Sequence, residues 1–286
     1  MTQDWSRYWR ASDRPLEAMH AHFERHVYHR HSHETYSFGV TETGAQSFSC
    51  RGSAHTSAAG MIMAFNPDDP HDGHATDELG FTYRMVHIGP SLVENALSDS
   101  TGRHTGLPLF ATPVVNDQAL AARLRALHAA LLDSGTTALR RDELLTATIA
   151  GLVRRAATTP LTEQRRPSRS TTIARQARQL LHDRVMDDLT IDDLARSTGT
   201  SRYAVYRAFH AKYGLPPSDY QRQLRLRAAR TLIADGTPIA EAATATGFAD
   251  QSHLTRWFTR YFGLTPGTYR QATTPDTALP TRARAR

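Results

Sequence analysis

The sequence predicts an α+β protein of two domains: an amino-terminal β-barrel and an all-helical unit that contains two helix-turn-helices. Two observations lead to this fold class. Short strand-like stretches separated by glycine turns run from residue 16 to residue 88, and a helix–glycine–helix pattern occurs twice between residues 190 and 271. Many short strands at close spacing are typical of a small barrel or sandwich. The repeated pattern is typical of a duplicated helix-turn-helix.

Charge divides the chain in the same way. Residues 168–286 contain 18 basic and 10 acidic residues, whereas residues 1–167 contain 16 and 18, so the net charge of +6 comes from the second half. A basic half is typical of a domain that binds phosphates. The histidines are distributed the other way, with 12 of the 15 before residue 168. Two halves of different chemistry predict two separate roles.

Composition disfavours a membrane-spanning, secreted or disulfide-stabilised protein. No apolar stretch approaches the roughly 18 residues that a bilayer-crossing helix needs, so no membrane partner is expected. The first residues lack the charged-then-apolar order of a signal peptide. Cys50 is the single cysteine, so no internal disulfide can form. We therefore expect a cytoplasmic protein.

The barrel is expected to fill residues 1–112, and an aromatic segment precedes its strands. Trp5, Tyr8 and Trp9 are spaced at i, i+3 and i+4, which predicts a short helix or an ordered arm. A hairpin turn is expected at Thr41–Gly44, where a glycine follows a run of strand-forming residues. The expected strands include Tyr36–Val40, Gln46–Cys50, Met61–Phe65 and Phe81–Ile88.

Histidines mark a candidate ligand site in the barrel. His31 and His33 lie two residues apart, so a strand would place them on one face. Together with a hairpin, Gly60 and a proline–histidine pair that ends at His71, they resemble the two signature stretches of the cupin barrel over residues 16–90. We expect a pocket for a small-molecule effector in the barrel. The candidate effector-binding residues are His31, His33, Tyr36, Phe38 and His71.

A metal ion is the alternative occupant of this site. Three neutral imidazoles could bind Zn²⁺ or Fe²⁺. The carboxylate of the cupin pattern has no counterpart, however, because the chain has Ser37 and Phe38 where it would fall and Glu34 lies outside the pattern. We therefore expect neither a metal nor another cofactor. A polar strand face of histidines that binds no ligand is the third possibility.

Residues 113–157 are expected to form two helices that follow the barrel. The first is amphipathic, with one apolar seam, and the second is expected from about Arg141 to Ala157. The seam consists of Leu120, Leu124, Leu127 and Leu131. The helices either pack on their own barrel or form a coiled-coil-like dimer interface. The two arrangements are compatible, because one face of the helix pair can contact the barrel while another contacts a second chain. We expect a homodimer through this segment.

The carboxyl-terminal domain is expected at residues 173–271, after a linker over 158–172 that is rich in Thr, Pro, Arg and Ser. Thr190 starts its first helix-turn-helix with a near capping box, Gly199 allows the turn, and Ser201 caps the next helix. A long helix over Pro217–Ala234 joins the two units. A disordered basic tail is expected over 272–286.

Equivalent arginines in the two units point to DNA. Arg207 and Arg256 lie 49 residues apart, as do Phe209 and Phe258. A single surface arginine is usually only solvated, but two at equivalent places indicate a function. Arg can bind guanine, Gln can bind adenine, and Tyr or Thr can contact thymine methyl groups or phosphates. The predicted DNA-binding residues are Ser201, Arg202, Tyr203, Tyr206, Arg207, Gln251, Ser252, Thr255 and Arg256.

Three runs carry a specific resemblance. They are Ser201-x-x-x-Val205-x-Arg207-x-Phe209, Gly247-Phe248-x-Asp250-Gln251-Ser252-x-Leu254-x-Arg256-x-Phe258, and Phe262-Gly263-Leu264-Thr265-Pro266-x-x-Tyr269-Arg270. With them, residues 173–271 resemble the DNA-binding domain of the AraC/XylS transcription regulators. The resemblance implies base contact by outer positions of both second helices. It also implies an amino-terminal cupin-like domain for effector binding and dimerisation.

We therefore predict a transcription regulator of this type, not an enzyme. Its expected partners are operator DNA, a small-molecule effector and a second copy of the chain, with RNA polymerase as a further candidate. One alternative is a metal-dependent cupin enzyme with a DNA-binding appendage, whose metal centre would be His31, His33 and His71. Another is a regulator whose barrel binds nothing and only dimerises.

Overall fold

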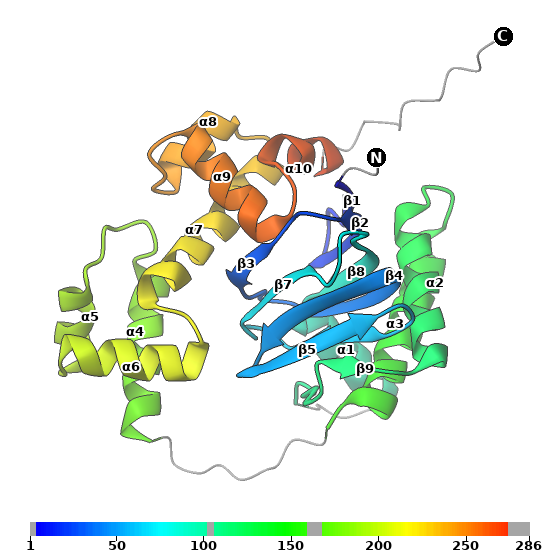
Figure 1. Cartoon of the computed structure of the whole chain (residues 1–286), viewed down its shortest axis with the longest axis horizontal. Coiled ribbons are helices and arrows are strands. Elements are labelled where there is room, and N and C mark those ends of the chain that lie inside the picture. The colour runs from blue at the N-terminus through cyan, green and yellow to red at the C-terminus, as the bar shows by residue number, and fades with distance from the viewer. Residues whose placement is uncertain (1–3, 102–105, 159–167, 274–286) are drawn as a thin grey trace.

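The computed structural model describes residues 4–101, 106–158 and 168–273 and has a sheet-rich amino-terminal domain beside a helical carboxyl-terminal domain (Figure 1). The strands are β1 (Trp5–Arg10), β2 (Leu16–Phe23), β3 (Tyr28–His31), β4 (Tyr36–Cys50), β5 (Ser53–Ala58), β6 (Ile62–Phe65), β7 (His71–Ala75), β8 (Phe81–Ile88) and β9 (Val114–Val115). The helices are α1 (Pro90–Thr101), α2 (Gln118–Leu132), α3 (Ala138–Ala156), α4 (Arg169–Asp183), α5 (Ile191–Thr198), α6 (Arg202–Tyr213), α7 (Pro217–Ala234), α8 (Ile239–Ala245), α9 (Gln251–Phe262) and α10 (Pro266–Thr273). No helix in these ranges is long and apolar enough to cross a bilayer. The predicted two-domain α+β fold class is confirmed.

The strands of the described residues form one sheet in which β4 is shared by two parts. The first part has the order β1-β2-β8-β4-β6-β9, and the second joins β5 and β7 to β4 and β3 to β7. All of these pairings are antiparallel. The first half of β4 pairs with β6 and β8, and its second half pairs with β5 and β7.

The hairpin turn predicted at Thr41–Gly44 is wrong, because β4 continues through it. β4 runs for 15 residues, and its register against β8 shifts between Thr41 and Thr43. Gly44 has a φ of +68°, and a Cβ there would lie 2.0 Å from the carbonyl oxygen of Gly80. Glycine therefore allows a bulge at which the strand bends instead of turning back. This bend carries the chain from one part of the sheet to the other.

The aromatic segment at the amino terminus is a strand and not a helix. β1 pairs with β2, and Tyr8 lies opposite Met19 while Trp9 lies opposite Ala18. Tyr8 packs against the inner core of the domain and Trp9 against the outer one. The aromatic spacing therefore reflects the two faces of an edge strand, since successive residues of a strand point to opposite sides.

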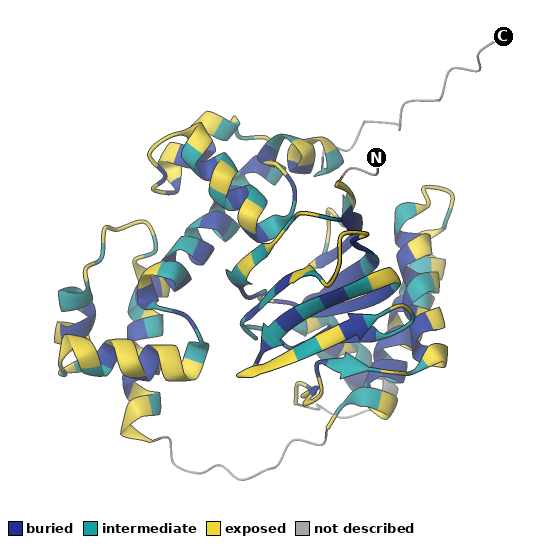
Figure 2. Cartoon of the chain, in the orientation of Figure 1, coloured by how far each residue is buried: buried dark blue, intermediate teal, exposed yellow. Residues whose placement is uncertain are grey.

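The sheet has two buried faces with different neighbours. Helices α1, α2 and α3 cover the outer face, where Phe38 and Ile62 share a core with Leu124 of α2. The inner face contributes Phe48 and Phe81 to a second core. Figure 2 shows buried residues along the strands and exposed residues on the outer sides of α2 and α3.

The leucine seam of α2 packs inside its own chain, which is the first of the two alternatives expected for this segment. Leu124 and Leu131 are only 2% and 1% exposed, and both belong to the core between α2 and the sheet. The strands of the same domain already cover this narrow apolar seam, so the seam has no surface left for a second chain. Any contact between two chains through α2 or α3 must therefore use their outer faces.

Several element boundaries differ from the expected ones. α1 follows β8 directly and was not predicted, and β9 lies beyond the expected barrel end at residue 112, where it pairs with β6. α4 begins at Arg169 inside the expected linker, because the Ser168 side chain caps its first turn. Residues 159–167 of that linker and residues 274–286 of the expected tail lie outside the described part of the chain.

The carboxyl-terminal helices form two units, and the second shares its core with the barrel. Helices α4, α5 and α6 pack around Val205 and Phe209 together with the start of α7. Helices α8, α9 and α10 and the end of α7 belong to the inner-face core, in which Phe258 and Tyr269 join Phe81 of β8. α7 connects the two cores over the residues predicted for it. The second unit is therefore packed as part of the barrel's inner core.

The local signals predicted for the first helix-turn-helix are confirmed. Thr190 and Asp193 form a capping box, and Gly199 ends α5 with a φ of +59°. Ser201 caps α6 by accepting a hydrogen bond from a backbone N–H. In the second unit Asp250 has the same capping role for α9. Each of these features depends on neighbouring residues alone.

Candidate DNA-reading helices and interdomain pocket

Helix α6 presents polar and aromatic side chains to solvent. Val205 and Phe209 lie four residues apart and therefore share one side of the helix. That side faces the core of the first unit. On the opposite side Tyr203 and Tyr206 are 70% and 46% exposed, and Arg207 is exposed as well. These side chains form one outer face of α6, and all three belong to the predicted DNA-binding residues.

Neighbouring groups hold several of these side chains. The guanidinium of Arg207 lies 5.7 Å from the ring centroid of Tyr203, a cation–π contact along the helix face. Arg202 forms an ion pair with Asp192 of α5, so its charge is partly neutralised. The Ser201 hydroxyl is engaged as the helix cap. Arg207 differs from Arg202, because its exposed guanidinium has no carboxylate partner among the described residues.

Helix α9 has a corresponding outer face. Gln251, Ser252 and Arg256 are exposed, and Thr255 is half-buried. A groove runs between these four side chains and residues 26–27 of the loop between β2 and β3. The outer face of α9 therefore lies next to the barrel.

A cavity of about 60 Å³ lies where the barrel meets the second unit. A single water needs roughly 10–15 Å³ on this scale, so the cavity has room for a few waters or a small chemical group. The barrel lines it with side chains that include Tyr8, Glu17, Met19, Tyr28, His31, His33, Phe48, Phe65, His71, Tyr83 and His87. The carboxyl-terminal domain lines it with Arg230, Tyr261, Phe262, Leu264 and Tyr269.

Three of the predicted effector residues meet in this cavity. One side-chain nitrogen each of His31, His33 and His71 lies within 4.8 Å of the others. The Nδ1 atom of His31 lies 2.7 Å from the carbonyl oxygen of His29, and that of His71 lies 2.9 Å from the carbonyl oxygen of Asp69. A carbonyl oxygen only accepts, so each Nδ1 carries the proton and each Nε2 keeps its lone pair.

The imidazoles of the cavity are neutral near pH 7. Burial lowers the pKa of His71 and of His87 to about 4. Burial, and after it the neighbouring imidazoles, also lower the pKa of His31 and of His33 well below the ordinary value of 6.5. Neutral imidazoles with free nitrogen lone pairs can accept hydrogen bonds or bind a metal ion.

Tyr36 and Phe38 lie on the other face of the sheet. The hydroxyl of Tyr36 donates to the carbonyl oxygen of Pro108 at 2.8 Å, and Phe38 packs in the outer core. Between them Ser37 points inward, where its hydroxyl lies 2.8 Å from Nδ1 of His87. The sequence showed that successive side chains of β4 point to opposite faces of the sheet, but it did not show which face the helices would cover.

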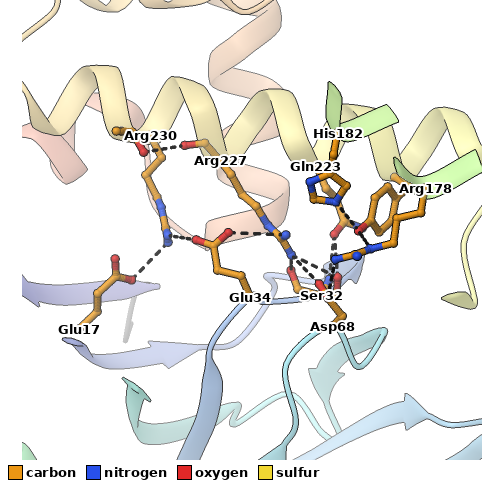
Figure 3. A network of polar contacts seen from close by, with 11 residues as sticks. Glu17, Ser32, Glu34, Asp68, Arg178, His182, Gln223, Arg227 and Arg230 are labelled. Carbon is orange, nitrogen blue, oxygen red and sulfur yellow. Dashed lines mark hydrogen bonds and ion pairs between the residues drawn. The ribbon is translucent and has the colours of Figure 1, made fainter. Parts of the chain in front are cut away.

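An ion pair in the cavity was missed by the sequence reasoning. Arg230 of α7 lies 3.2 Å from the carboxylate of Glu17 on β2 and 3.5 Å from that of Glu34 (Figure 3). Burial alone would raise the pKa of Glu17, but the charge of Arg230 and other neighbours outweigh it and lower that pKa. Burial likewise opposes the charge of Arg230, yet Glu17 holds the pKa of Arg230 above its ordinary value. The signal for this ion pair in the sequence was Glu17, an acidic residue next to apolar residues of β2.

A wider polar network attaches α7 to the barrel (Figure 3). Arg227 donates to the carbonyl oxygen of Ser32 at 2.9 Å, and the backbone N–H of Ser32 donates to the side chain of Gln223 at 3.0 Å. Arg227 also lies 3.7 Å from Asp68, which forms an ion pair with Arg178 of α4 at 3.1 Å. Helix α4 of the first unit and the connecting helix α7 therefore have polar contacts with the same loops of the barrel.

Comparison with known proteins identifies the family. Residues 15–149 match the AraC-like ligand binding domain, and residues 194–272 match a helix-turn-helix domain. An uncharacterized HTH-type transcriptional regulator from Bacillus subtilis, YbfI, is 31% identical over 225 residues, which covers 78% of this chain and 80% of that protein. The chain belongs to the AraC/XylS family of transcription regulators.

Other relatives agree with this assignment. The transcriptional activator NphR of Rhodococcus is 34% identical to the regulator over 131 residues, which covers 46% of this chain and 37% of NphR. A crystal structure of ToxT from Vibrio cholerae is 13% identical, with a TM-score of 0.55 over 95% of this chain and 99% of ToxT. The regulator therefore shares the two-domain fold of ToxT. Its relatives are transcription regulators, which gives no support to the predicted enzyme alternative.

Proposed function

We propose that this regulator reads operator DNA with α6 and α9, and that a small molecule in the interdomain cavity controls the reading. The observation that carries the proposal is the composition of the cavity wall, to which both domains contribute side chains. A ligand that contacts both walls changes the free energy of their contact, and by linkage it changes any binding that requires the domains to move.

The outer faces of α6 and α9 are the proposed DNA-reading surfaces. Their residues supply the guanidinium, amide and hydroxyl groups that bind base edges and phosphates. The single helix α7 connects the two units. Successive major-groove segments on one face of the duplex lie about 34 Å apart. We expect the operator to contain two short conserved segments about one helical turn apart.

The proposed effector binds at the histidine end of the cavity. Its contacts would be His31, His33 and His71 on the barrel and Arg230 on α7. A crystal structure of Vibrio cholerae ToxT contains a bound unsaturated fatty acid. The cavity of the present chain is about 60 Å³, which is small, and buried imidazoles and a paired arginine line part of it. A compact effector that carries a polar group fits this cavity better than a long acyl chain.

Further partners belong to the same proposal. Two chains would pair through the outer faces of α2 and α3, since their inner faces are buried, and the DNA-bound dimer would contact RNA polymerase. The regulator would work in the cytoplasm, where its operator lies, and it would act by binding and not by catalysis. Light scattering of the full-length chain tests the dimer, because a monomer at micromolar concentration would remove the paired-chain part of the proposal.

Selection of bound DNA from a random pool tests the proposed reading of DNA. The full-length chain should enrich sequences with two conserved segments about 10 base pairs apart. Enrichment of one segment alone would restrict reading to one helix. No enrichment at any salt concentration would contradict the proposed function.

A further inference from the structure

The groove between α9 and the loop from β2 to β3 has a positively charged wall. It has a volume of about 530 Å³, and none of its lining side chains is a carboxylate. Ser252, Arg256 and Arg260 of the lining lie four residues apart, so they form one column along α9. Arg256 and Arg260 are exposed, and neither forms an ion pair among the described residues. The α9 wall of the groove therefore offers hydrogen-bond donors and two uncompensated charges to an anion.

The opposite wall of the groove belongs to the barrel and consists of His26 and Val27. Val27 is 61% exposed, which is unusual for an apolar side chain beside a polar helix face. Burial lowers the pKa of His26, so its ring adds no charge near pH 7. The positive charge of the groove therefore comes from α9 alone, and the barrel contributes an apolar edge.

The loop that carries this wall is held in place by its own contacts. The carboxylate of Asp4 accepts a hydrogen bond from the backbone N–H of Glu24 at 2.6 Å. The ring of His26 lies 4.8 Å from the ring of Phe23 and 4.5 Å from that of Tyr28, both centroid to centroid. The wall is therefore preorganised beside α9 and does not need a ligand to order it.

The dimensions of DNA determine what this groove must accommodate if α9 reads bases. An α-helix with its side chains is roughly 10–12 Å across, and the major groove is about 12 Å wide. A helix that enters the major groove therefore fills its width, and a sugar-phosphate backbone runs along each flank of the helix. The flank of α9 that faces the barrel is the groove described above. One DNA backbone would therefore pass between α9 and Val27.

We propose that this groove holds one sugar-phosphate backbone of the operator, so that the β2–β3 loop of the barrel is part of the DNA interface. Arg260 would bind a phosphate from the helix side, and the apolar edge of Val27 would contact a deoxyribose from the other side. The proposal rests on the proposed reading of DNA by α9. It adds a contact from the barrel, which lies outside the helix-turn-helix units.

The test measures the affinity of the full-length chain for its selected operator over a range of salt concentrations. Val27→Lys adds a cation to the wall, and one further neutralised phosphate should steepen the salt slope by about 0.9, so the fall in affinity between about 50 and 200 mM salt should grow roughly three- to fourfold. Val27→Glu should weaken binding, because it places a carboxylate against the phosphates. Arg260→Gln should make the slope shallower by about 0.9 and leave base preference unchanged.

Ala59→Lys and Ala59→Glu are the matched controls for added charge. Ala59 is an exposed residue of the turn between β5 and β6, where the neighbouring Gly60 lies against Gln118 of α2. Figure 1 shows α2 and α9 on opposite sides of the barrel. Both control variants should keep the salt slope of the wild type.

Two results would overturn the proposal. One is a salt slope of Val27→Lys equal to that of Ala59→Lys, which would place the loop outside the interface. The other is the same loss or gain of affinity in Val27→Lys and Val27→Glu, which would make the loop a steric obstacle to DNA. Circular dichroism checks folding, and if a loop variant unfolds, an unchanged slope in Arg260→Gln overturns the proposal instead. Changed base preference in Arg256→Ala, with Val27 variants that match the controls, would remove the loop contact and leave the reading by α9 intact.

Discussion

At the scale of single residues, the informative positions are polar side chains in apolar surroundings. Glu17 and His128 are 6% and 0% exposed, although each lies in an otherwise apolar stretch. Glu17 is paired with Arg230 of the other domain. The Nε2 atom of His128 lies 3.0 Å from the carbonyl oxygen of Met19, and its Nδ1 lies 3.3 Å from Arg84. The neutral ring satisfies both contacts, with Nε2 as donor and Nδ1 as acceptor.

This arrangement makes His128 a source of acid sensitivity. Burial, with help from the charge of Arg84, lowers the pKa of His128 to about 4. In the unfolded chain the pKa is about 6.5, so between pH 6.5 and pH 4 the unfolded state binds a proton that the folded state does not. The contribution of His128 is therefore fully present above about pH 6.5 and is lost as the pH falls towards 4.

Replacing His128 by Gln should remove that part of the pH dependence. Urea unfolding at pH 7 and pH 5 measures it, and the loss of unfolding free energy between these values should shrink by up to about 2 kcal/mol in the variant. His210→Gln, which changes an exposed histidine, should behave as the wild type. An unchanged loss in His128→Gln would show that this ring titrates normally in the folded chain.

At the scale of elements, local signals were sufficient for the helix-turn-helices and insufficient for the sheet. The capping box at Thr190 and the left-handed glycine at Gly199 depend on adjacent residues, so the sequence determines them directly. The bulge at Gly44 depends on close packing against Gly80, which is distant in the sequence. The face of β4 that carries Tyr36 could not be assigned either, because alternation separates two faces without indicating which one the helices cover.

The residues of the candidate site were likewise predictable only where local sequence patterns determine them. Histidine spacing identified His31 and His33 as neighbours, although β3 ends at His31 and His33 lies just beyond it. The resemblance to the cupin barrel identified His71. Arg230 was not identified, although it lies on a correctly predicted helix. Its role depends on how the second unit packs against the barrel, and the helix period does not contain that information.

Helices α6 and α9 should each govern one segment of the operator. Replacing Arg207 or Arg256 by Ala should cost about 1–3 kcal/mol of operator affinity if the arginine reads a guanine, and should relax base preference in its own segment only. If both contact phosphates, affinity should instead fall uniformly across sequences, and the salt dependence should decrease by about one unit for each arginine. Selection from a random pool with each variant distinguishes these outcomes.

Arg7→Ala is the control for the lost charge, because Arg7 is an exposed residue of β1 in the barrel domain. Its affinity and base preference should match the wild type. If both Arg207→Ala and Arg256→Ala kept wild-type affinity and base preference, the assignment of α6 and α9 to the major groove would be wrong.

The buried seam of α2 leads to a prediction about stability. Leu124→Asp should lower the free energy of unfolding by at least about 3 kcal/mol, because it places an unpaired charge in a core that has no room for water. Leu79→Asp is the control, since Leu79 lies between β7 and β8 and is 83% exposed. Thermal unfolding with light scattering separates the outcomes, and a stable monomeric Leu124→Asp chain would restore the seam as a dimer interface.

At the scale of the whole molecule, the two helix-turn-helix units are attached to the barrel differently. The first has a core of its own, whereas the second continues the inner core of the sheet and closes the cavity. A ligand or substitution in the cavity should therefore act first on α9 and on the operator segment that α9 is proposed to read. The polar network of α7 extends this connection towards the first unit (Figure 3).

The affinity of the full-length chain for its selected operator, compared among wild type, Glu17→Gln, Arg230→Gln and the double variant, tests this connection most directly. We expect each single variant to change operator affinity by at least about fivefold, the lower end of usual coupling between sites. The double variant should differ from the product of the single effects, and the change should be concentrated in the segment governed by Arg256. Affinities within twofold of the wild type in all three variants would show that the barrel and the DNA-reading helices act independently.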